Sequence, residues 1–322
     1  MGRLISDKFT AWQAECEARF QQLKANEEEL NRIFIDIYGL QDELTPEVAD
    51  KDVTVHRIFN TKDDVPESMK GSNYVRTLRD EIVSLISYAV GCLFGRYSLD
   101  VEGLAYAGGE WDASKYHTFL PDPDNCIPIT DTDYFKDDIV GLFCEWVKIV
   151  YGEDTLEENL DFVAKALGSK GVTSKDVIRS YFLYDFFKDH CKTYQKRPIY
   201  WLYDSGKQNG FKALIYMHRY DSDTSGKVRA EYLFKMQRVY ENELKRAQDT
   251  IDSSTNSREV SQAEKRKEKL TKQLKETRDY DQRLAHIALA RIPIDLDDGV
   301  KVNYEKVQTA PDGKKLDVLA KI

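Results

Sequence analysis

The 322-residue chain is long enough for two ordinary domains, or for one domain with helical extensions. Its 41% hydrophobic and 11% aromatic residues allow a substantial core, and its 32% charged residues indicate much exposed helical surface. The formal net charge of −9 argues against a free-standing, non-specific DNA-binding protein, because such proteins are usually basic, but it is compatible with a local basic face.

The cysteines and histidines suggest neither a disulfide framework nor a metal site. The five cysteines are widely spaced without a CxxC pair, and the five histidines are scattered. We therefore expect reduced thiols and no bound metal. No apolar run approaches the length of a membrane span, and the first residues, MGRLISDKF, lack a signal-peptide pattern. These features predict a cytoplasmic protein without a membrane partner.

The N-terminal third begins with a pattern typical of one long helix. Apolar residues keep helical spacing from Phe9 to Ile37, Ser6-Asp7 can cap the start, and Gly39 is expected to end it. We expect residues 1–52 to form a long connector helix. Residues 53–73 are charged and contain proline, which predicts an irregular surface loop.

The middle of the chain is predicted to form a helical core within residues 53–223. A stretch rich in glycine, proline and aspartate, residues 99–133, should form ordered loops. Thr155 with Glu158 has the spacing of a capping box, and Thr173 or Ser174 can cap the last helix. The expected helices cover residues 74–97, 134–151, 155–167 and 174–191.

A basic and aromatic segment, residues 188–220, lies within this acidic chain. Ile199, Trp201 and Tyr203 alternate with residues of the opposite face, DSGKQNG at 204–210 has turn chemistry, and alternation resumes at Lys212. These patterns predict a β-hairpin over residues 197–220. Cations mixed with flat rings suit a phosphate backbone and exposed bases, whereas the alternative is a half-buried hairpin with solvated lysines.

If the hairpin faces DNA, its cations should make the contacts. They precede the first strand, occupy the turn or lie on the second strand, so one rigid element could present them. The candidate DNA-binding residues are Lys196, Arg197, Lys207, Lys212 and Arg219.

Two long helices, residues 224–251 and 258–290, are predicted near the C-terminus. The polar linker DSSTNS joins them, and Leu233, Tyr240 and Ala247 repeat every seven residues. This pattern predicts an antiparallel coiled-coil arm over residues 224–291. The run KRKEKLTKQLK at 265–275 could contact phosphates, but we favour the outer face of a soluble arm. Residues 292–322 read as an extended tail.

No recognisable catalytic motif occurs in the sequence. There is no GxGxxG, GxSxG, Walker lysine loop or HExxH. The acidic cluster DLDD at 295–298 could bind a divalent metal, but three acids before a glycine are more often a loop. We therefore assign no catalytic, cofactor-binding or metal-ligating residue.

Several long blocks closely resemble a known family. The resemblance covers nearly the whole chain, in the same order, to the C-terminal part of the PglX family, the adenine-specific DNA methyltransferases of bacterial BREX phage-defence systems. The segment RPIYW…FKALIYMHR is also similar to the C-terminal region of single-chain type II restriction–modification methyltransferases. The blocks are residues 25–48, 86–112, 155–168, 185–220 and 294–308.

This resemblance implies a role in reading a DNA target. Adenine methyltransferases carry a glycine-rich turn for S-adenosylmethionine and an Asn-Pro-Pro-Tyr type motif that holds the flipped base. The chain has neither motif, and it contains no Pro-Pro step. The resemblance therefore implies no cofactor in this chain, S-adenosylmethionine for the parent enzyme, and double-stranded DNA and an upstream methyltransferase domain as partners.

We expect a mostly α-helical α+β protein: a helical core with a β-hairpin and a C-terminal antiparallel coiled-coil hairpin. The expected function is DNA target recognition or scaffolding in a site-specific adenine methyltransferase of phage defence, without catalysis by this chain alone. The alternative is a protein-interaction module that docks other defence-system proteins without touching DNA. The acidic balance favours the alternative, and the basic aromatic hairpin favours DNA.

Overall fold

A computed structural model describes residues 3–322 as two compact units. The first unit contains the described residues up to Ile86 together with Val150–Gly168, and the second contains Ser87–Ile149 and Ser169–Ile322. Helices predominate among the described residues, and the strands form one two-stranded and one three-stranded sheet. The predicted mostly α-helical α+β class is therefore confirmed.

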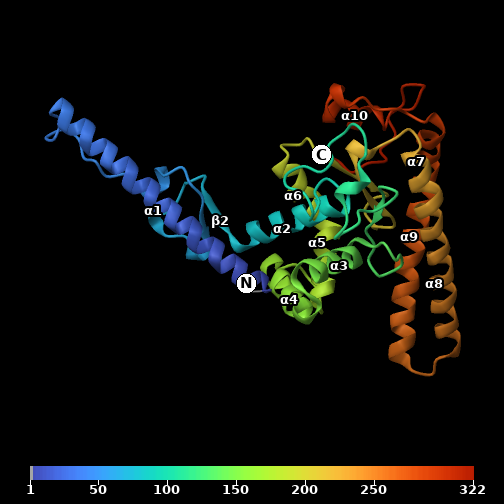
Figure 1. Cartoon of the computed structure of the whole chain (residues 1–322). Helices are drawn as coiled ribbons and strands as arrows, with labels where there is room; N and C mark the ends of the chain where they lie inside the picture. The colour runs from blue at the N-terminus through green and yellow to red at the C-terminus, as the bar shows by residue number, and fades with distance from the viewer. Residues whose placement is uncertain (1–2) are drawn as a thin grey trace. The chain divides into compact units, whose positions relative to one another are not determined.

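The first unit is built on the long helix α1 (Ile5–Tyr38), which the sequence predicted (Figure 1). Gly39 ends the helix in the left-handed conformation, at φ 66°, and its N–H reaches the Asp36 carbonyl. Glycine adopts this conformation without a steric penalty, which is why it is favoured after a helix. The last turns of α1 carry apolar side chains that stay exposed, from Leu30 to Tyr38.

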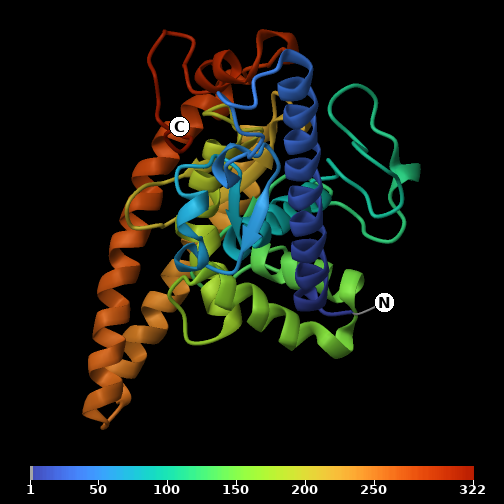
Figure 2. The same cartoon turned by 90° about the vertical axis from the view of Figure 1, so that its left-hand side faces the viewer.

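Residues 53–73 are more ordered than the expected surface loop. Short strands β1 (Arg57–Phe59) and β2 (Val75–Thr77) pair in parallel, with Ile58 opposite Arg76. Figure 2 shows this small sheet beside α1. Phe20 of α1 is fully buried there with Val53 and Met69. No periodic pattern predicts this core, because its residues are isolated in the chain and meet only through tertiary contacts.

Helix α4 (Leu156–Leu167) completes the first unit. The amide of Asn159 caps the start of α1, because its Oδ1 accepts a hydrogen bond of 2.7 Å from the Ile5 N–H. The predicted capping box at Thr155 does not form: the Thr155 hydroxyl donates to the Tyr151 carbonyl at 3.1 Å instead of capping α4.

Helices α2 (Leu78–Leu93) and α3 (Ile139–Tyr151) have residues in both units, because the boundaries fall within them. In the second unit, the predicted helix at 174–191 is two helices, α5 (Ser174–Tyr184) and α6 (Phe186–Thr193). The chain changes direction at Asp185, whose φ of −122° is not helical. Thr173 and Asp176 form the capping box of α5.

The hairpin is present, but it lies inside a three-stranded sheet. Strand β4 (Tyr200–Asp204) pairs antiparallel with β5 (Lys212–Tyr216), and Leu202 lies opposite Leu214. A two-residue strand β3 (Ile127–Pro128) covers the other edge of β5. The order β3-β5-β4 makes β5 the central strand, and all five of its residues are buried. The hairpin therefore has no solvent-exposed face at β5.

The two C-terminal helices form an antiparallel arm, and they lie side by side in Figures 1 and 2. Gln237 contacts the Thr277 carbonyl at 3.2 Å, and Glu241 pairs with Arg278 at 2.8 Å. This register places Leu244 opposite the region around Leu274, as the linker length predicts. The elements are α7 (Thr224–Lys227), a π-helical segment (Val228–Leu233), α8 (Phe234–Ser253) and α9 (Ser257–Ala290).

The expectation of an extended tail at 292–322 is wrong in part. Residues Val300–Lys306 form helix α10, and the segment that follows runs along the outer edge of β4. There the Leu202 carbonyl accepts a 2.8 Å hydrogen bond from the Ala320 N–H. The seven-residue helix follows DLDDG and is too short for its periodicity to be recognised in the sequence.

All five cysteines are buried, and none of them forms a disulfide with another described residue. Among the described residues, no helix is both long enough and apolar enough to cross a membrane.

Candidate nucleic-acid interface

The aromatic rings of the hairpin belong to the core. Tyr200, Trp201, Tyr203 and Tyr216 are each no more than 1% exposed. Tyr200 stacks on Phe94, with ring centroids 5.5 Å apart. These rings cannot stack on bases without unfolding the sheet, so any DNA contact by this region must come from the loops at the ends of the strands.

Lys212 lies at the start of β5 and is buried. Its ammonium group donates a 2.9 Å hydrogen bond to the Leu183 carbonyl and lies 3.6 Å from the Asp204 carboxylate. Burial raises the pKa of Asp204, and the Lys212 charge opposes that shift. A buried ammonium requires such partners. The structure therefore gives Lys212 the role of tying β5 to the end of α5.

Arg219 follows β5 and is also held by protein groups. Its guanidinium donates to the carbonyls of Asp122 at 2.7 Å and Pro123 at 3.1 Å. It also lies over the ring of Trp111, 4.6 Å from the centroid. A planar donor that satisfies carbonyls and stacks on an indole is a typical arginine environment. Arg219 thus joins the 108–124 loop to the sheet.

Lys207 is exposed in the hairpin turn, and the turn is clamped by α9. Glu276 accepts hydrogen bonds from the Ser205 hydroxyl and the Gln208 N–H, both at 2.7 Å, and from the Gly210 N–H at 3.0 Å. The Tyr240 hydroxyl of α8 donates to the Gly210 carbonyl at 2.8 Å. The turn is therefore a rigid mount for Lys207.

The turn and the arm share a basic surface that the sequence did not reveal. A hollow of about 380 Å³ is lined by Ser205 and Gln208 of the turn and by residues of α9, including the exposed Lys272 and Lys275. The run KRKEKLTKQLK was the available signal, but only the docking of α9 on the turn brings Lys272 and Lys275 to the same hollow as Gln208. The remaining lining residues are Glu276, Asp279 and Arg283.

Lys196 and Arg197 are exposed at the other end of β4. Gln195 and Lys196 both have left-handed backbones, at φ 49° and 60°, and the Lys196 N–H donates to the Cys191 carbonyl at 2.8 Å. The five residues of β4 separate them from the turn, roughly 17 Å at the usual rise of a strand. The five predicted residues therefore do not converge on one point.

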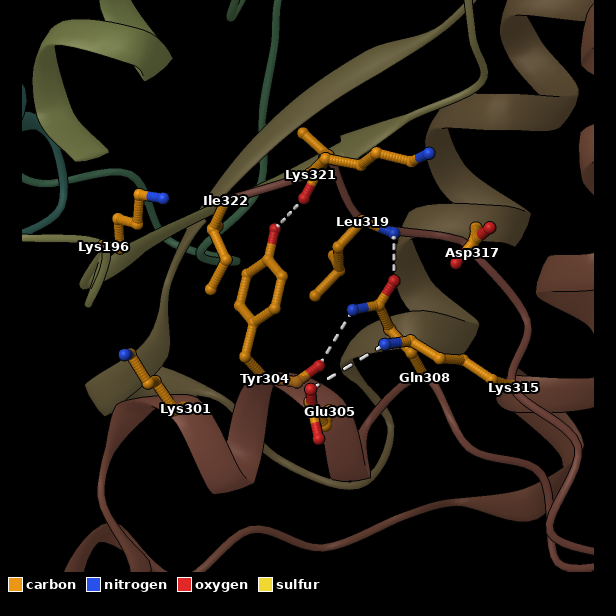
Figure 3. A pocket seen from close by; sticks show the side chains of 11 residues that line it. Lys196, Lys301, Tyr304, Glu305, Gln308, Lys315, Asp317, Leu319, Lys321 and Ile322 are labelled. Carbon is orange, nitrogen blue, oxygen red and sulfur yellow. Dashed lines mark hydrogen bonds and ion pairs between the residues drawn. The ribbon is translucent and has the colours of Figure 1, made fainter. Parts of the chain in front are cut away.

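Lys196 lines a pocket of about 430 Å³ together with α10 and the final residues (Figure 3). Lys301 of α10 and Lys321 of the tail also line it, and no local sequence pattern connects these three lysines. The other lining residues are Tyr304, Glu305, Gln308, Lys315, Asp317, Leu319, Ala320 and Ile322.

The His190 side chain binds the backbone at the start of β4. Its Nε2 accepts hydrogen bonds from the N–H groups of Ile199 and Tyr200, both at 3.1 Å. Burial, with a smaller contribution from the Arg96 charge, lowers the pKa of His190 to about 3. The imidazole is therefore a neutral acceptor that fixes the backbone next to Lys196 and Arg197.

Asp122, Asp124 and Asp137 are acidic residues that precede or follow β3. Burial, together with the nearby Asp124 carboxylate, raises the pKa of Asp122 to about 7. The Tyr232 hydroxyl lies 2.7 Å from a carboxylate oxygen of both Asp124 and Asp137. Within residues 3–322, no group of three or more His, Cys, Asp or Glu side chains is arranged to hold a metal ion.

Comparison with known proteins identifies relatives over nearly the whole chain, although no protein-family model matches it. Over 307 residues the chain is 49% identical to "Adenine-specific methyltransferase PglX" of Lacticaseibacillus casei (strain Zhang), an alignment that covers 94% of this chain and 24% of that protein. The chain is therefore similar to one part of that methyltransferase.

A second relative comes from another bacterium. The "Adenine-specific methyltransferase BrxX" of Escherichia coli O9:H4 (strain HS) is 38% identical over 301 residues, covering 89% of this chain and 25% of that protein. The chain thus spans about a quarter of the length of both relatives. The resemblance inferred from the sequence blocks is confirmed.

Proposed function

We propose that this chain is a DNA-recognition and scaffold part of a site-specific adenine methyltransferase of phage defence, with no methyl transfer of its own. The observation that carries the proposal is the clamped hairpin: exposed cations stand at both of its ends, on backbone fixed by His190 at one end and Glu276 at the other. Rigid mounting of charged groups favours specific over diffuse DNA contact.

In this proposal the five predicted residues divide into two groups. Lys196, Arg197 and Lys207 contact DNA directly, because their side chains are exposed. Lys212 and Arg219 position the loops, because their polar atoms already bind protein carbonyls. Double-stranded DNA and the methyltransferase domain of the parent enzyme are the proposed partners, with S-adenosylmethionine bound by that domain.

The test is a salt titration of duplex DNA binding by the 322-residue chain, measured by fluorescence anisotropy. We expect the affinity to fall steeply with salt, and Lys207→Ala to flatten the logarithmic slope by about one unit on all sequences. Arg197→Ala should either do the same or, if the guanidinium reads guanine, cost about 1–3 kcal/mol at one base position.

Lys245→Ala is the matched control, because this lysine lies on the exposed surface of α8 away from the turn. It should leave the slope unchanged. The proposal fails if the wild-type chain does not bind duplex DNA at low salt, or if Lys207→Ala and Arg197→Ala both bind as the wild type does.

A second candidate function, protein docking, is favoured by the acidic end of α1. Residues 25–50 contain eight acids and one arginine, so most of the net charge of the chain lies there. The same segment exposes Phe34, Ile37 and Tyr38 at 54%, 67% and 70%. An apolar face with an acidic rim suits a protein partner with an apolar face and basic residues, not DNA.

The two functions can be separated with one variant. Phe34→Ser with Ile37→Ser removes the apolar face and leaves every hairpin cation in place. If this variant binds duplex DNA normally but no longer associates with the methyltransferase domain in sedimentation experiments, the α1 end is a docking site. If association is unchanged, protein docking through this face is rejected.

A further inference from the structure

The pocket lined by Lys196, Lys301 and Lys321 has more lysines than acidic side chains in its lining. Its lysines come from three segments that are far apart in sequence: the loop before β4, the start of α10 and the final residues. In Figure 3, Lys196 and Lys301 lie on the same side of the Tyr304 ring. The tertiary structure therefore gathers cations that no local pattern predicts.

The charge of the pocket is not neutralised by its own acids. Four lysines line it, whereas its negative groups are Glu305, which lies 3.8 Å from Lys315, Asp317 and the terminal carboxylate of Ile322. Lys196, Lys301 and Lys321 are exposed, and none of them forms an ion pair with another residue of the described range 3–322. The surplus of positive charge raises the electrostatic potential in the pocket and attracts an anion.

The walls of the pocket are fixed. The Tyr304 hydroxyl donates to the Ala320 carbonyl, and Gln308 accepts a 2.9 Å hydrogen bond from the Leu319 N–H. Lys196 is held at φ 60°, a left-handed conformation that is unfavourable for a residue with a side chain. Such backbone outliers concentrate where a side chain must be presented in one direction.

We propose that this pocket binds a phosphate group. Lysine ammonium groups are compact charges that suit phosphate oxygens, and the volume of about 430 Å³ lies within the usual range of ligand sites. Because this inference rests on the proposed function, the phosphate is one of the DNA backbone, bound next to the start of β4. The pocket then anchors the duplex, while Arg197 beside it is free to reach a base edge.

The test measures each lysine by itself. The 322-residue chain is treated with an acetylating reagent, alone, with inorganic phosphate or with a short duplex, and the modification rate of each lysine is read by mass spectrometry. We expect duplex DNA, and inorganic phosphate at higher concentration, to slow acetylation of Lys196 and Lys301 several-fold. Lys175, exposed at the start of α5, should react at the same rate throughout.

Two variants test the same point by affinity. Lys301→Ala should flatten the salt slope of DNA binding by about one unit, and Lys196→Gly should do the same while folding normally, since glycine accepts the positive φ. Lys175→Ala is the control. Melting curves that match the wild type will show that the variants remain folded.

The outcomes separate this inference from the proposed function. If the chain binds DNA but Lys196 and Lys301 stay fully reactive, the pocket proposal is overturned and DNA recognition stands. If the chain does not bind DNA but inorganic phosphate protects both lysines, the pocket is a phosphate site for another ligand and DNA recognition falls. If neither duplex DNA nor inorganic phosphate protects these lysines, the pocket proposal is overturned.

Discussion

His190 makes part of the folding free energy depend on pH. Its pKa of about 3 in the folded chain lies below the ordinary value near 6.5, so the stability from the neutral ring is present above about pH 6.5 and is lost as the pH falls towards 3. In His190→Gln the amide oxygen can still accept the Ile199 and Tyr200 N–H groups, but it does not titrate.

We therefore expect the wild type to lose about 1.4 kcal/mol per pH unit relative to His190→Gln between about pH 6 and about pH 4. Urea denaturation followed by circular dichroism at each pH measures this difference. A difference that stays constant with pH would show that His190 is protonated in the folded chain or exposed to solvent.

Asp122 has the opposite dependence. Its pKa of about 7 lies above the unfolded value, so its contribution is favourable below about pH 4 and is lost as the pH rises through 7. Asp122→Asn keeps an oxygen for the Cys126 N–H, which donates to Asp122 at 3.1 Å. The variant should gain stability relative to the wild type as the pH rises from about 5 to about 8, while Asp249→Asn on the arm should show no such trend.

These two residues lie in the same unit, and their effects offset each other between about pH 4 and about pH 6.5. The unfolding free energy of the wild type should therefore vary little from this source over that range. The single variants reveal slopes that the wild-type curve hides.

At the scale of elements, α9 holds the hairpin turn through one carboxylate. Glu276→Gln keeps the shape of the side chain but replaces one acceptor oxygen and removes the charge, so the three hydrogen bonds to the turn cannot all persist. We expect a loss of about 2 kcal/mol in unfolding free energy. Hydrogen exchange should also be faster at the Gln208 and Gly210 amides.

The control is Glu268→Gln, which changes a glutamate about two helical turns before Glu276 in α9. Glu268 pairs only with the exposed Lys272, four residues away, so the turn amides should exchange as in the wild type. Equal exchange in both variants would mean that α9 does not clamp the turn.

Phe20, in the first half of helix α1, and Phe34, in its second half, differ in burial. Phe20 is fully buried with Val53 and Met69, so Phe20→Ala leaves a cavity and should cost about 3–5 kcal/mol. Phe34 is 54% exposed, and Phe34→Ala should change the unfolding free energy by less than about 0.5 kcal/mol. Urea midpoints of the two variants check the contrast, and similar losses would place Phe34 in a core.

The elements that the sequence predicted are those with local signals. Helix α1 has helical spacing and Gly39, the hairpin has alternation and turn chemistry, and the arm has a short polar linker. Strand β3 and the parallel pair β1–β2 are too short to carry a pattern and exist only through long-range pairing. The burial of both faces of β5 was likewise not predictable, since alternation identifies two faces but not whether both become covered.

At the scale of the whole molecule, we expect no methyl transfer by this chain. The sequence lacks both the glycine-rich cofactor turn and a Pro-Pro step. Incubation with duplex DNA and labelled S-adenosylmethionine should give no incorporation above a protein-free blank. A full-length PglX-type enzyme serves as the positive control, and label transferred by the 322-residue chain would contradict the proposed division of labour.

The candidate site was predictable only in outline. The cations of the hairpin were visible as a local excess of charge, and three of them are exposed. Lys212 is buried, and its ammonium group binds the Leu183 carbonyl. Arg219 is half-buried, and its guanidinium binds a loop about a hundred residues away in the sequence. Lys301 and Lys321 join Lys196 only because α10 and the tail fold back along β4, which no local pattern encodes.

The five buried thiols allow the local unfolding of each unit to be measured by chemical labelling. Cys16 belongs to the first unit, and Cys92, Cys126, Cys144 and Cys191 belong to the second. A buried thiol must become exposed to solvent before it can react with an aromatic disulfide reagent. The labelling rate at each cysteine therefore reports how readily the structure around it opens. Phe20→Ala should therefore accelerate labelling at Cys16 alone, while Glu276→Gln should accelerate only the second set. The native chain thus carries its own reporters of whether its two units open together or separately.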